Sequence, residues 1–208
     1  MVLRFKQMTK LIQVFAKAPV KGQVKTRIAK AAGDDFALHI HKKLCAAVIG
    51  TALATDVDEV EVWTTNVAAQ QYFEEFGVKC LQQQGTHLGT RMDFALRHGL
   101  ARYNQVIIVG ADALSITPDY LAEAFRALDQ SSVVVGPALD GGYIMIGATE
   151  PASCVFGNMP WGTADVMGLT LERLLTNGVN FHVMGDRWDI DTLQDIEQHV
   201  PQWLKTES

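Results

Sequence analysis

One segment constrains the fold of this chain more than any other: QVIIVGAD at residues 105–112, a run with an apolar middle that ends on a carboxylate. A strand that is hydrophobic on both faces is typical of the centre of a parallel sheet covered on both sides. Other short runs rich in β-branched or aromatic residues alternate with longer helical patterns, at 11–16, 57–64, 78–83, 132–138, 143–148 and 179–184. This alternation predicts an α/β fold with a mostly parallel central sheet and helices on both faces.

Three of the expected helices have recognisable start signals. Thr117 is followed by Pro118, which combines a capping hydroxyl with a proline at the first helical position. Thr192 and Asp195 stand at the spacing of a capping box. In GTADVMGLTLERLL, Thr163 is a candidate cap. These signals predict where three helices begin.

Composition excludes several classes of protein. A chain of 208 residues that is 48% hydrophobic can bury a core and is expected to form a single domain spanning residues 1–208. A formal net charge of −5 argues against nucleic acid as a partner, because such proteins usually carry a broad basic face. The three cysteines show no C-x-x-C spacing, which predicts reduced thiols rather than a disulfide framework or a zinc site. LIQVFA (11–16) is too short for a secretion signal or a membrane span, so we expect a cytoplasmic protein that does not bind membranes.

Ligands of such sheets bind in the crevice at the carboxyl ends of the strands, and the loop after the first expected strand is unusually basic. In FAKAPVKGQVKTRIA (15–29), Lys17, Lys25 and Arg27 are candidates for binding phosphate oxygens. An ordinary solvated loop is the alternative. No Walker A loop or G-x-G-x-x-G fingerprint is present, which disfavours those two nucleotide-binding classes. Arg91, in HLGTRM, is expected to line the same crevice.

Acidic side chains fall at the same predicted edge. Asp112 directly follows the central strand, and Asp189 and Asp191 lie in RWDIDT near the C-terminus. Magnesium commonly takes one or two protein carboxylates and completes its shell with water and substrate phosphates. Turn formation by Asp112 and helix capping by Asp191 are the simpler alternatives. Cations and carboxylates at one rim indicate a metal-bound polyphosphate between them.

Two further stretches have the character of an acceptor site. GPALDGGYIMIG combines Asp140, Gly141, Gly142 and Tyr143, where the glycines permit close backbone approach and the tyrosine offers a polar tip. A tight hairpin turn at LDGG explains the same residues without a ligand. Trp161 precedes an expected helix and is placed either to stack on a ring or to pack in the core.

Taken in order, FAKAPVKGQVKTRIA, HLGTRM, VIIVGADALSITP, GPALDGGYIMIG, PWGTADV and DIDTLQDI resemble one family. This is the radical-SAM/selenodomain-associated transferase family of the GT-A-fold nucleotide-diphospho-sugar transferase superfamily. The basic loop is also similar to that of phospholactate guanylyltransferases. The resemblance implies a Rossmann-like nucleotide-binding sheet and a divalent metal, Mg²⁺ or Mn²⁺, held by Asp112 and Asp191 with Asp189 beside them. It implies phosphate binding by Lys17, Lys25 and Arg27.

One loop departs from that pattern. Relatives usually read Gly-Ser-Asp-Cys-Pro and then an acidic residue, whereas this chain has GADALSIT at 110–117. The candidate metal ligand is retained, but the proline and the neighbouring acid are absent, which puts the geometry of the loop in question.

Three functions follow from these residues and the resemblance. The first is glycosyl transfer from a sugar nucleotide to a small-molecule acceptor, and the second is nucleotidyl transfer from a nucleoside triphosphate with release of pyrophosphate. In either reaction, Lys25 and Asp112 are the candidate catalytic residues. The third is a non-catalytic nucleotide-binding protein, which the altered loop would suit.

Overall fold

A seven-stranded sheet forms the centre of the computed structural model, which describes residues 8–204. The strands stand in the order β3-β2-β1-β4-β6-β5-β7. Their bounds are β1 Lys10–Ala16, β2 Glu59–Thr64, β3 Lys79–Gln82, β4 Gln105–Gly110, β5 Val133–Pro137, β6 Tyr143–Ala148 and β7 Phe181–Val183. β1 pairs in parallel with β2 and β4, and β2 with β3, so the predicted parallel centre is confirmed.

β6 runs antiparallel to both of its neighbours, β4 and β5. The cause is the tight turn between β5 and β6, where Gly141 has a φ of +90°. Glycine adopts this left-handed region without the steric penalty of a Cβ atom. The LDGG turn expected from the sequence is therefore confirmed, and it reverses the chain at the edge where ligands of such sheets bind.

Helices occupy the connections between the strands. They are α1 Thr26–Ala32, α2 Asp34–Leu53, α3 Gln70–Glu74, α4 Leu88–Leu100, α5 Pro118–Leu128, α6 Val166–Thr176 and α7 Leu193–His199. Short 3₁₀ turns lie at Val67–Ala69, Ser153–Val155 and Pro201–Leu204.

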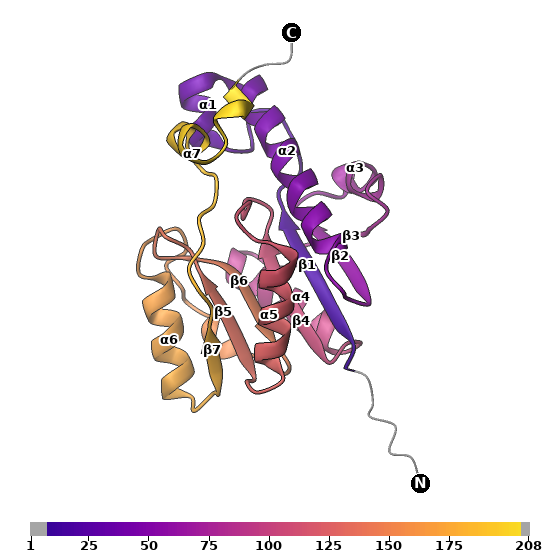
Figure 1. Ribbon diagram of the computed structural model, residues 1–208, viewed down its shortest axis with the longest axis vertical. Coiled ribbons are helices and arrows are strands. Elements are labelled where there is room, and N and C mark those ends of the chain that lie inside the picture. Colours follow the sequence, from indigo (N-terminus) through magenta and orange to yellow (C-terminus); the bar gives the residue numbers. More distant parts are fainter. Residues whose placement is uncertain (1–7, 205–208) are drawn as a thin grey trace.

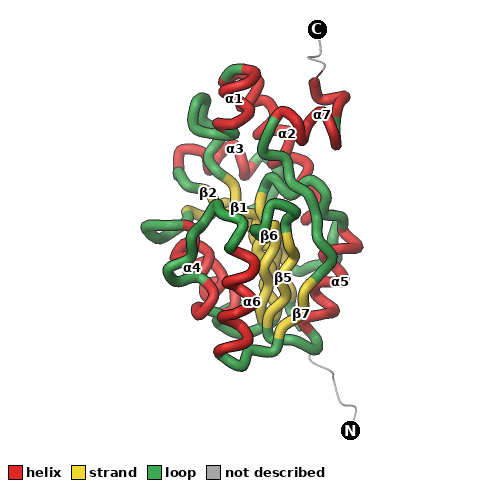
Figure 2. The backbone as a smooth tube through the Cα atoms, turned by 90° about the vertical axis from the view of Figure 1, so that its left-hand side faces the viewer, coloured by secondary structure: helices red, strands yellow, loops and turns green. Residues whose placement is uncertain are grey.

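The helices cover both faces of the sheet, as predicted. On one face, Val48 of α2, Phe73 of α3 and Phe125 of α5 pack against buried residues of β1 and β4. On the other face, Leu96 of α4 and Leu174 of α6 belong to a second buried cluster. Figure 2 shows the strands between α4 and α6 on one side and α5 on the other. The sheet is thus buried between two layers, which explains the apolar run Val106–Val109 within β4.

A third buried cluster joins the beginning and the end of the described chain. Ile28 of α1, Ile40 of α2 and Ile196 of α7 pack together, with Ile190 from the segment before α7. Figure 1 shows the segment after β7 running along the molecule to place α7 beside α1. This packing brings the residues next to Arg27 and those next to Asp191 into one region.

Two of the three predicted helix starts are confirmed. Thr117 accepts a hydrogen bond from the backbone N–H of Tyr120 at 3.2 Å, and Thr192 forms a complete capping box with Asp195. The prediction for Thr163 is wrong, because α6 begins three residues later at Val166 and has no side-chain cap. The hydroxyl of Thr163 instead donates to the carbonyl of Pro160 at 3.0 Å, so it shapes the preceding loop.

By length and composition alone, α2 passes as a possible membrane span. Its apolar side chains have another explanation, since Ile40, Leu44 and Val48 are buried in the core clusters. We therefore interpret α2 as a core helix of the α/β fold.

Candidate functional site

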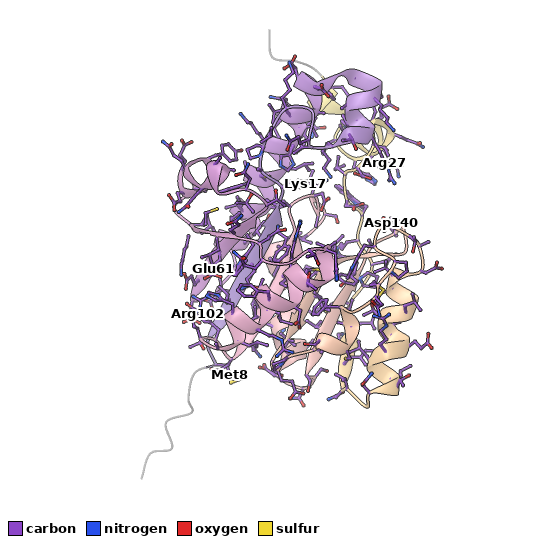
Figure 3. The ribbon with its side chains drawn as sticks, turned by 180° about the vertical axis from the view of Figure 1, so that it is seen from behind. Met8, Lys17, Arg27, Glu61, Arg102 and Asp140 are labelled. Carbon is purple, nitrogen blue, oxygen red and sulfur yellow. The ribbon has the colours of Figure 1, made fainter. Side chains whose placement is uncertain are left out.

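A cleft of about 520 Å³ opens at the carboxyl ends of the parallel strands. Its walls come from the residues just after β1, β2, β3 and β4, from the β5–β6 turn, and from the segment before α7. In Figure 3, Lys17, Arg27 and Asp140 lie between the middle and the upper part of the molecule, away from Met8 near its lower end. Most of the predicted site residues line this cleft: Lys17, Lys25, Arg91, Asp112, Asp140, Gly142, Tyr143, Trp161, Asp189 and Asp191.

Lys25 lies between two carboxylates at the centre of the cleft. Its Nζ is 3.0 Å from Oδ2 of Asp112 and 3.7 Å from Oδ1 of Asp191. The lysine side chain is only 8% exposed, whereas the two aspartates are 41% and 42% exposed. The ammonium is therefore buried behind carboxylates that still face the cleft.

The backbone at Lys25 is held in an uncommon conformation. Its φ of 43° and ψ of 52° place it in the left-handed region, directly before the first residue of α1. For a residue with a Cβ atom this conformation costs roughly 1–2 kcal/mol. The turn directs the side chain of Lys25 inward to the carboxylates instead of outward to solvent.

Arg27 forms the second cation–carboxylate contact of the site. Its Nη1 lies 2.7 Å from Oδ2 of Asp191, and its own side chain is 66% exposed. Arg27 is absent from the lining of the cleft, so it contacts Asp191 from the outer side. Asp191 is consequently bracketed by Lys25 on one side and Arg27 on the other.

Backbone contacts fix the acidic residues relative to each other. The N–H of Ile190 donates to the carbonyl of Asp112 at 3.2 Å, which ties the segment before α7 to the loop after β4. The N–H of Asp191 donates to Oδ2 of Asp195 at 2.9 Å, within the same capping arrangement that starts α7. Asp112, Asp189 and Asp191 are thereby brought to one side of the cleft, as the sequence led us to expect.

A glycine makes room for the carboxylate of Asp112. A Cβ atom placed on Gly110 would lie 2.6 Å from Oδ1 of Asp112, which is too close for any real contact. A glycine at the end of β4 therefore allows the carboxylate to fold back over the strand end. This role of Gly110 was not predicted from the sequence.

Charge coupling in this group appears in three pKa shifts. Burial alone would raise the pKa of Asp112, but the charge and the hydrogen bond of Lys25 hold that pKa below its ordinary value. Burial would likewise lower the pKa of Lys25, and the charges of Asp112 and Asp191 outweigh it and raise that pKa. Burial, followed by the negative charges of Asp112 and Asp140, raises the pKa of Asp189 to about 6. Lys25 and Asp112 are thus a charged pair at neutral pH, with a third carboxyl beside them that resists ionisation.

His41 is a cleft residue for which the sequence predicted no role. It is buried on α2, and its ring Nε2 lies 2.9 Å from the backbone carbonyl of Lys17, to which it donates when that nitrogen carries the proton. Burial lowers the pKa of His41, which favours the neutral ring. His41 therefore anchors the start of the basic loop. A single histidine on an amphipathic helix carries no sequence signal for such a contact.

The opposite wall of the cleft is formed by the β5–β6 turn and the loop before α6. Tyr143 and Trp161 meet edge to face with ring centroids 6.0 Å apart. Among the described residues, the Tyr143 hydroxyl and the Trp161 Nε1 are buried without a hydrogen-bond partner. Oδ1 of Asp140 accepts a hydrogen bond from the N–H of Gly142 at 2.9 Å, so the turn holds this carboxylate in place.

Gly141 differs from its neighbours, because it does not line the cleft. A Cβ atom at this position would lie 2.4 Å from the carbonyl oxygen of Ala164, so the glycine permits close packing against the loop before α6.

Arg91 of α4 also lines the cleft, and its Nε donates a hydrogen bond to the carbonyl of Gly85 at 3.0 Å. That contact fixes the loop before α4.

The donor set fits a divalent cation held jointly with a phosphate chain. Within residues 8–204, no group of three or more His, Cys, Asp or Glu side chains is assembled as a metal centre of its own. Asp112 and Asp191 nevertheless both present an oxygen to one position, which the Lys25 ammonium now holds. Two carboxylates are the usual protein contribution to magnesium sites whose remaining ligands are water and phosphate.

Residues 47–163, more than half of the chain, match the sequence family described as "Uncharacterized protein conserved in bacteria (DUF2064)". The chain belongs to the DUF2064 family. No functionally curated protein matches this DUF2064 chain. The motifs suggested a narrower assignment, to the radical-SAM-associated transferases, and this family match does not confirm it.

Solved structures share the fold of the DUF2064 chain. A protein from Desulfovibrio desulfuricans G20, described as a nucleotide-diphospho-sugar transferase, is 24% identical with a TM-score of 0.85, over 94% of this chain and 89% of that one. CMP:2-keto-3-deoxy-manno-octonic acid synthetase, solved with CTP, is 14% identical with a TM-score of 0.63, over 91% and 96%. Rv0371c from Mycobacterium tuberculosis H37Rv, solved with manganese, is 11% identical with a TM-score of 0.58, over 93% and 98%. The expected nucleotide-diphospho-sugar transferase fold is therefore confirmed.

Proposed function

We propose that this DUF2064 protein is a metal-dependent transferase that acts on a nucleotide, with a sugar nucleotide as donor and a small hydroxylated molecule as acceptor. The observation that carries the proposal is the position of Lys25 between Asp112 and Asp191 at the carboxyl edge of the sheet. A buried cation beside two partly exposed carboxylates is suited to a phosphate chain with its counter-ion.

The phosphates would lie against the loop after β1. Lys17 and Lys25 line the cleft from this loop, and Arg27 stands at its outer side beside Asp191. Charge-assisted hydrogen bonds from lysine and arginine to phosphate oxygens are about twice as strong as neutral ones. The buried contact of His41 with the Lys17 carbonyl would keep this loop in place for binding.

Asp112 and Asp191 would hold Mg²⁺ or Mn²⁺, and the bound ion would neutralise charge on the leaving diphosphate. Manganese in the structure of Rv0371c supports this choice of cation for the shared fold. Asp189 lies beside the pair, and burial, followed by the charges of Asp112 and Asp140, raises its pKa to about 6.

In the reaction, an oxygen of the acceptor hydroxyl forms a bond to the anomeric carbon, and the bond from that carbon to the diphosphate breaks. The nucleoside diphosphate leaves with the bonding electrons, while the carboxylate of Asp140 accepts the proton of the hydroxyl. Asp140, Gly142, Tyr143 and Trp161 form the wall of the cleft on which the acceptor would lie. The protein would contribute position and charge, which are the main sources of rate in such transfers.

A diphosphate suits the charge of the site better than a triphosphate does. Lys25 and Arg27 already face carboxylates, so less positive charge is left for a phosphate chain than the sequence of the loop indicates. Nucleotidyl transfer is the second candidate, and the CTP complex of a protein with this fold favours it. There the acceptor attacks the α-phosphorus and pyrophosphate leaves.

Product analysis separates these functions. The protein is incubated with each common sugar nucleotide and nucleoside triphosphate, with and without Mn²⁺, and the products are read by mass spectrometry. Metal-stimulated nucleoside diphosphate indicates glycosyl transfer, and pyrophosphate indicates nucleotidyl transfer. Nucleotide binding without either product would contradict a transferase and leave a nucleotide-binding protein.

Asp112→Asn is the variant that tests the metal in this assay. Because the substitution removes one of the two carboxylate charges and keeps the side-chain shape, we expect metal-stimulated turnover to disappear while the circular dichroism spectrum is unchanged. Asp186→Asn is a matched control, since Asp186 is exposed and outside the cleft. Retained metal stimulation in Asp112→Asn would show that the cation binds elsewhere.

A further inference from the structure

The position that two carboxylates offer to a cation is already held by a side chain of the protein. Nζ of Lys25 lies within 3.7 Å of both Asp112 and Asp191, and Arg27 adds a second positive charge at Asp191. Two cations thus face two anions at this position, and the carboxyl of Asp189 lies beside them. A free divalent ion that entered it would bring its positive charge close to an ammonium that is only 8% exposed.

A phosphate chain changes this arrangement of charges. An ion that arrives chelated to a diphosphate brings its own negative charge and also offers the ammonium of Lys25 new partners. The carboxylates can accept such an ion, because Asp112 and Asp191 keep 41% and 42% of their side-chain surface exposed. Without a phosphate chain, an ammonium of Lys25 that moved away from the two carboxylates would be a buried charge with no partner, which is strongly unfavourable.

The backbone of Lys25 supports a role for this exact position of the ammonium. A residue with a Cβ atom is held in the left-handed region at a cost, directly before α1. The consequence is that the ammonium is directed to Oδ2 of Asp112. A lysine that served only as a phosphate ligand from a surface loop would not need to be buried behind two carboxylates.

We propose that Lys25 occupies the divalent-cation position of the cleft and leaves it only when a phosphate chain takes its ammonium. The site therefore accepts its metal as a metal–diphosphate complex and discriminates against the free ion. This inference rests on the proposed function of the cleft, and it adds the form in which the substrate enters.

Binding of Mn²⁺ alone, followed by electron paramagnetic resonance of the free ion, tests the inference without any turnover. We expect weak binding to the wild-type protein and binding at least about tenfold tighter to Lys25→Met, because the competing charge is gone. Lys25→Asn is a second variant, since asparagine tolerates the left-handed backbone. Lys21→Met is the control: Lys21 pairs with Asp35 at the surface, and its loss should leave Mn²⁺ affinity unchanged.

Equal or weaker Mn²⁺ binding by both Lys25 variants would overturn the inference. If neither variant folds, thermal unfolding of the wild-type protein tests the inference instead. We expect Mn²⁺ with inorganic pyrophosphate to raise the melting temperature clearly more than Mn²⁺ alone or pyrophosphate alone, and equal stabilisation by Mn²⁺ alone would contradict the inference. Failure of the proposed function is recognised separately, as a wild-type protein that forms no product from any nucleotide.

Discussion

At the scale of single residues, the unusual feature of this protein is a lysine buried between two aspartates at an open cleft. Lys25 is ordinary in sequence, one of several cations in a loop, and only the left-handed turn before α1 directs it inward to Asp112 and Asp191. A sequence contains no direct signal for that turn, because lysine rarely adopts this conformation. The residue types of the site could be predicted, whereas their pairing could not.

Replacing Lys25 tests its role in nucleotide binding. Lys25→Ala should weaken binding of the preferred nucleotide by roughly ten- to a hundredfold, the scale of a lost charged hydrogen bond. Isothermal titration calorimetry with the nucleotide selected by the product assay provides the measurement. Lys21→Ala removes a lysine of the same loop that pairs with Asp35 outside the cleft, and it should bind as the wild type does. Wild-type affinity in Lys25→Ala would remove this lysine from the phosphate site.

Asp189 gives a prediction for the pH dependence of stability. Its pKa is raised from 3.8 to about 6 by burial and by nearby carboxylates, so the folded protein holds this proton more tightly than the unfolded chain does. The stability that comes from the protonated group is complete below about pH 4 and is lost as the pH rises towards 6. Asp189→Asn removes this titration. The free energy of unfolding of Asp189→Asn, measured with urea, should therefore rise relative to that of the wild type as the pH increases from 4 to 6. A difference that is constant over this interval would contradict the shifted pKa.

At the scale of elements, the basic loop and the C-terminal helix are positioned by each other. What the sequence presents as a loop through residue 27 becomes helix α1, whose Ile28 packs with Ile40 of α2 and Ile196 of α7. The short helix was not predicted, because seven residues carry too little periodicity and its stability comes from tertiary packing. The start of α7 was predicted correctly, since its capping box depends on local chemistry alone. Where local chemistry was weak, as at Thr163, the prediction failed.

The cap of α7 connects the stability of an element to the site. Thr192→Ala removes a capping hydroxyl and should cost about 1 kcal/mol in urea unfolding. Because the N–H of Asp191 and the N–H and hydroxyl of Thr192 all donate to Oδ2 of Asp195, the substitution should also weaken nucleotide binding. Thr9→Ala is the comparison: it removes a hydroxyl that bonds Asn104 at the opposite end of the sheet, where a loss of stability should leave binding intact. Equal nucleotide affinity in the two variants would show that the cap does not support the site.

At the scale of the whole molecule, the site exists because the end of the chain returns to its beginning. The sheet order places β1 and β4 side by side, which brings the loop after β1 next to Asp112. The packing of α7 on α1 then adds Asp191, and Figure 1 shows this return along the length of the molecule. Parallel pairing and the edge used for ligands could be predicted from the alternation of strands and helices. The return of α7 could not, because it depends on apolar contacts between residues more than 160 positions apart, such as Ile28 and Ile196.

The central claim is that cations from the first loop and carboxylates from the middle and end of the chain bind one metal-chelated phosphate chain. A crystal structure with Mn²⁺ and the diphosphate nucleotide selected by the binding assays tests it most directly, because the anomalous signal locates the ion. We predict the ion at Asp112 and Asp191, with Lys25 moved from them to the phosphate oxygens. An ion or a phosphate chain bound outside this cleft, or an ion bound while Lys25 still contacts both carboxylates, would contradict the account.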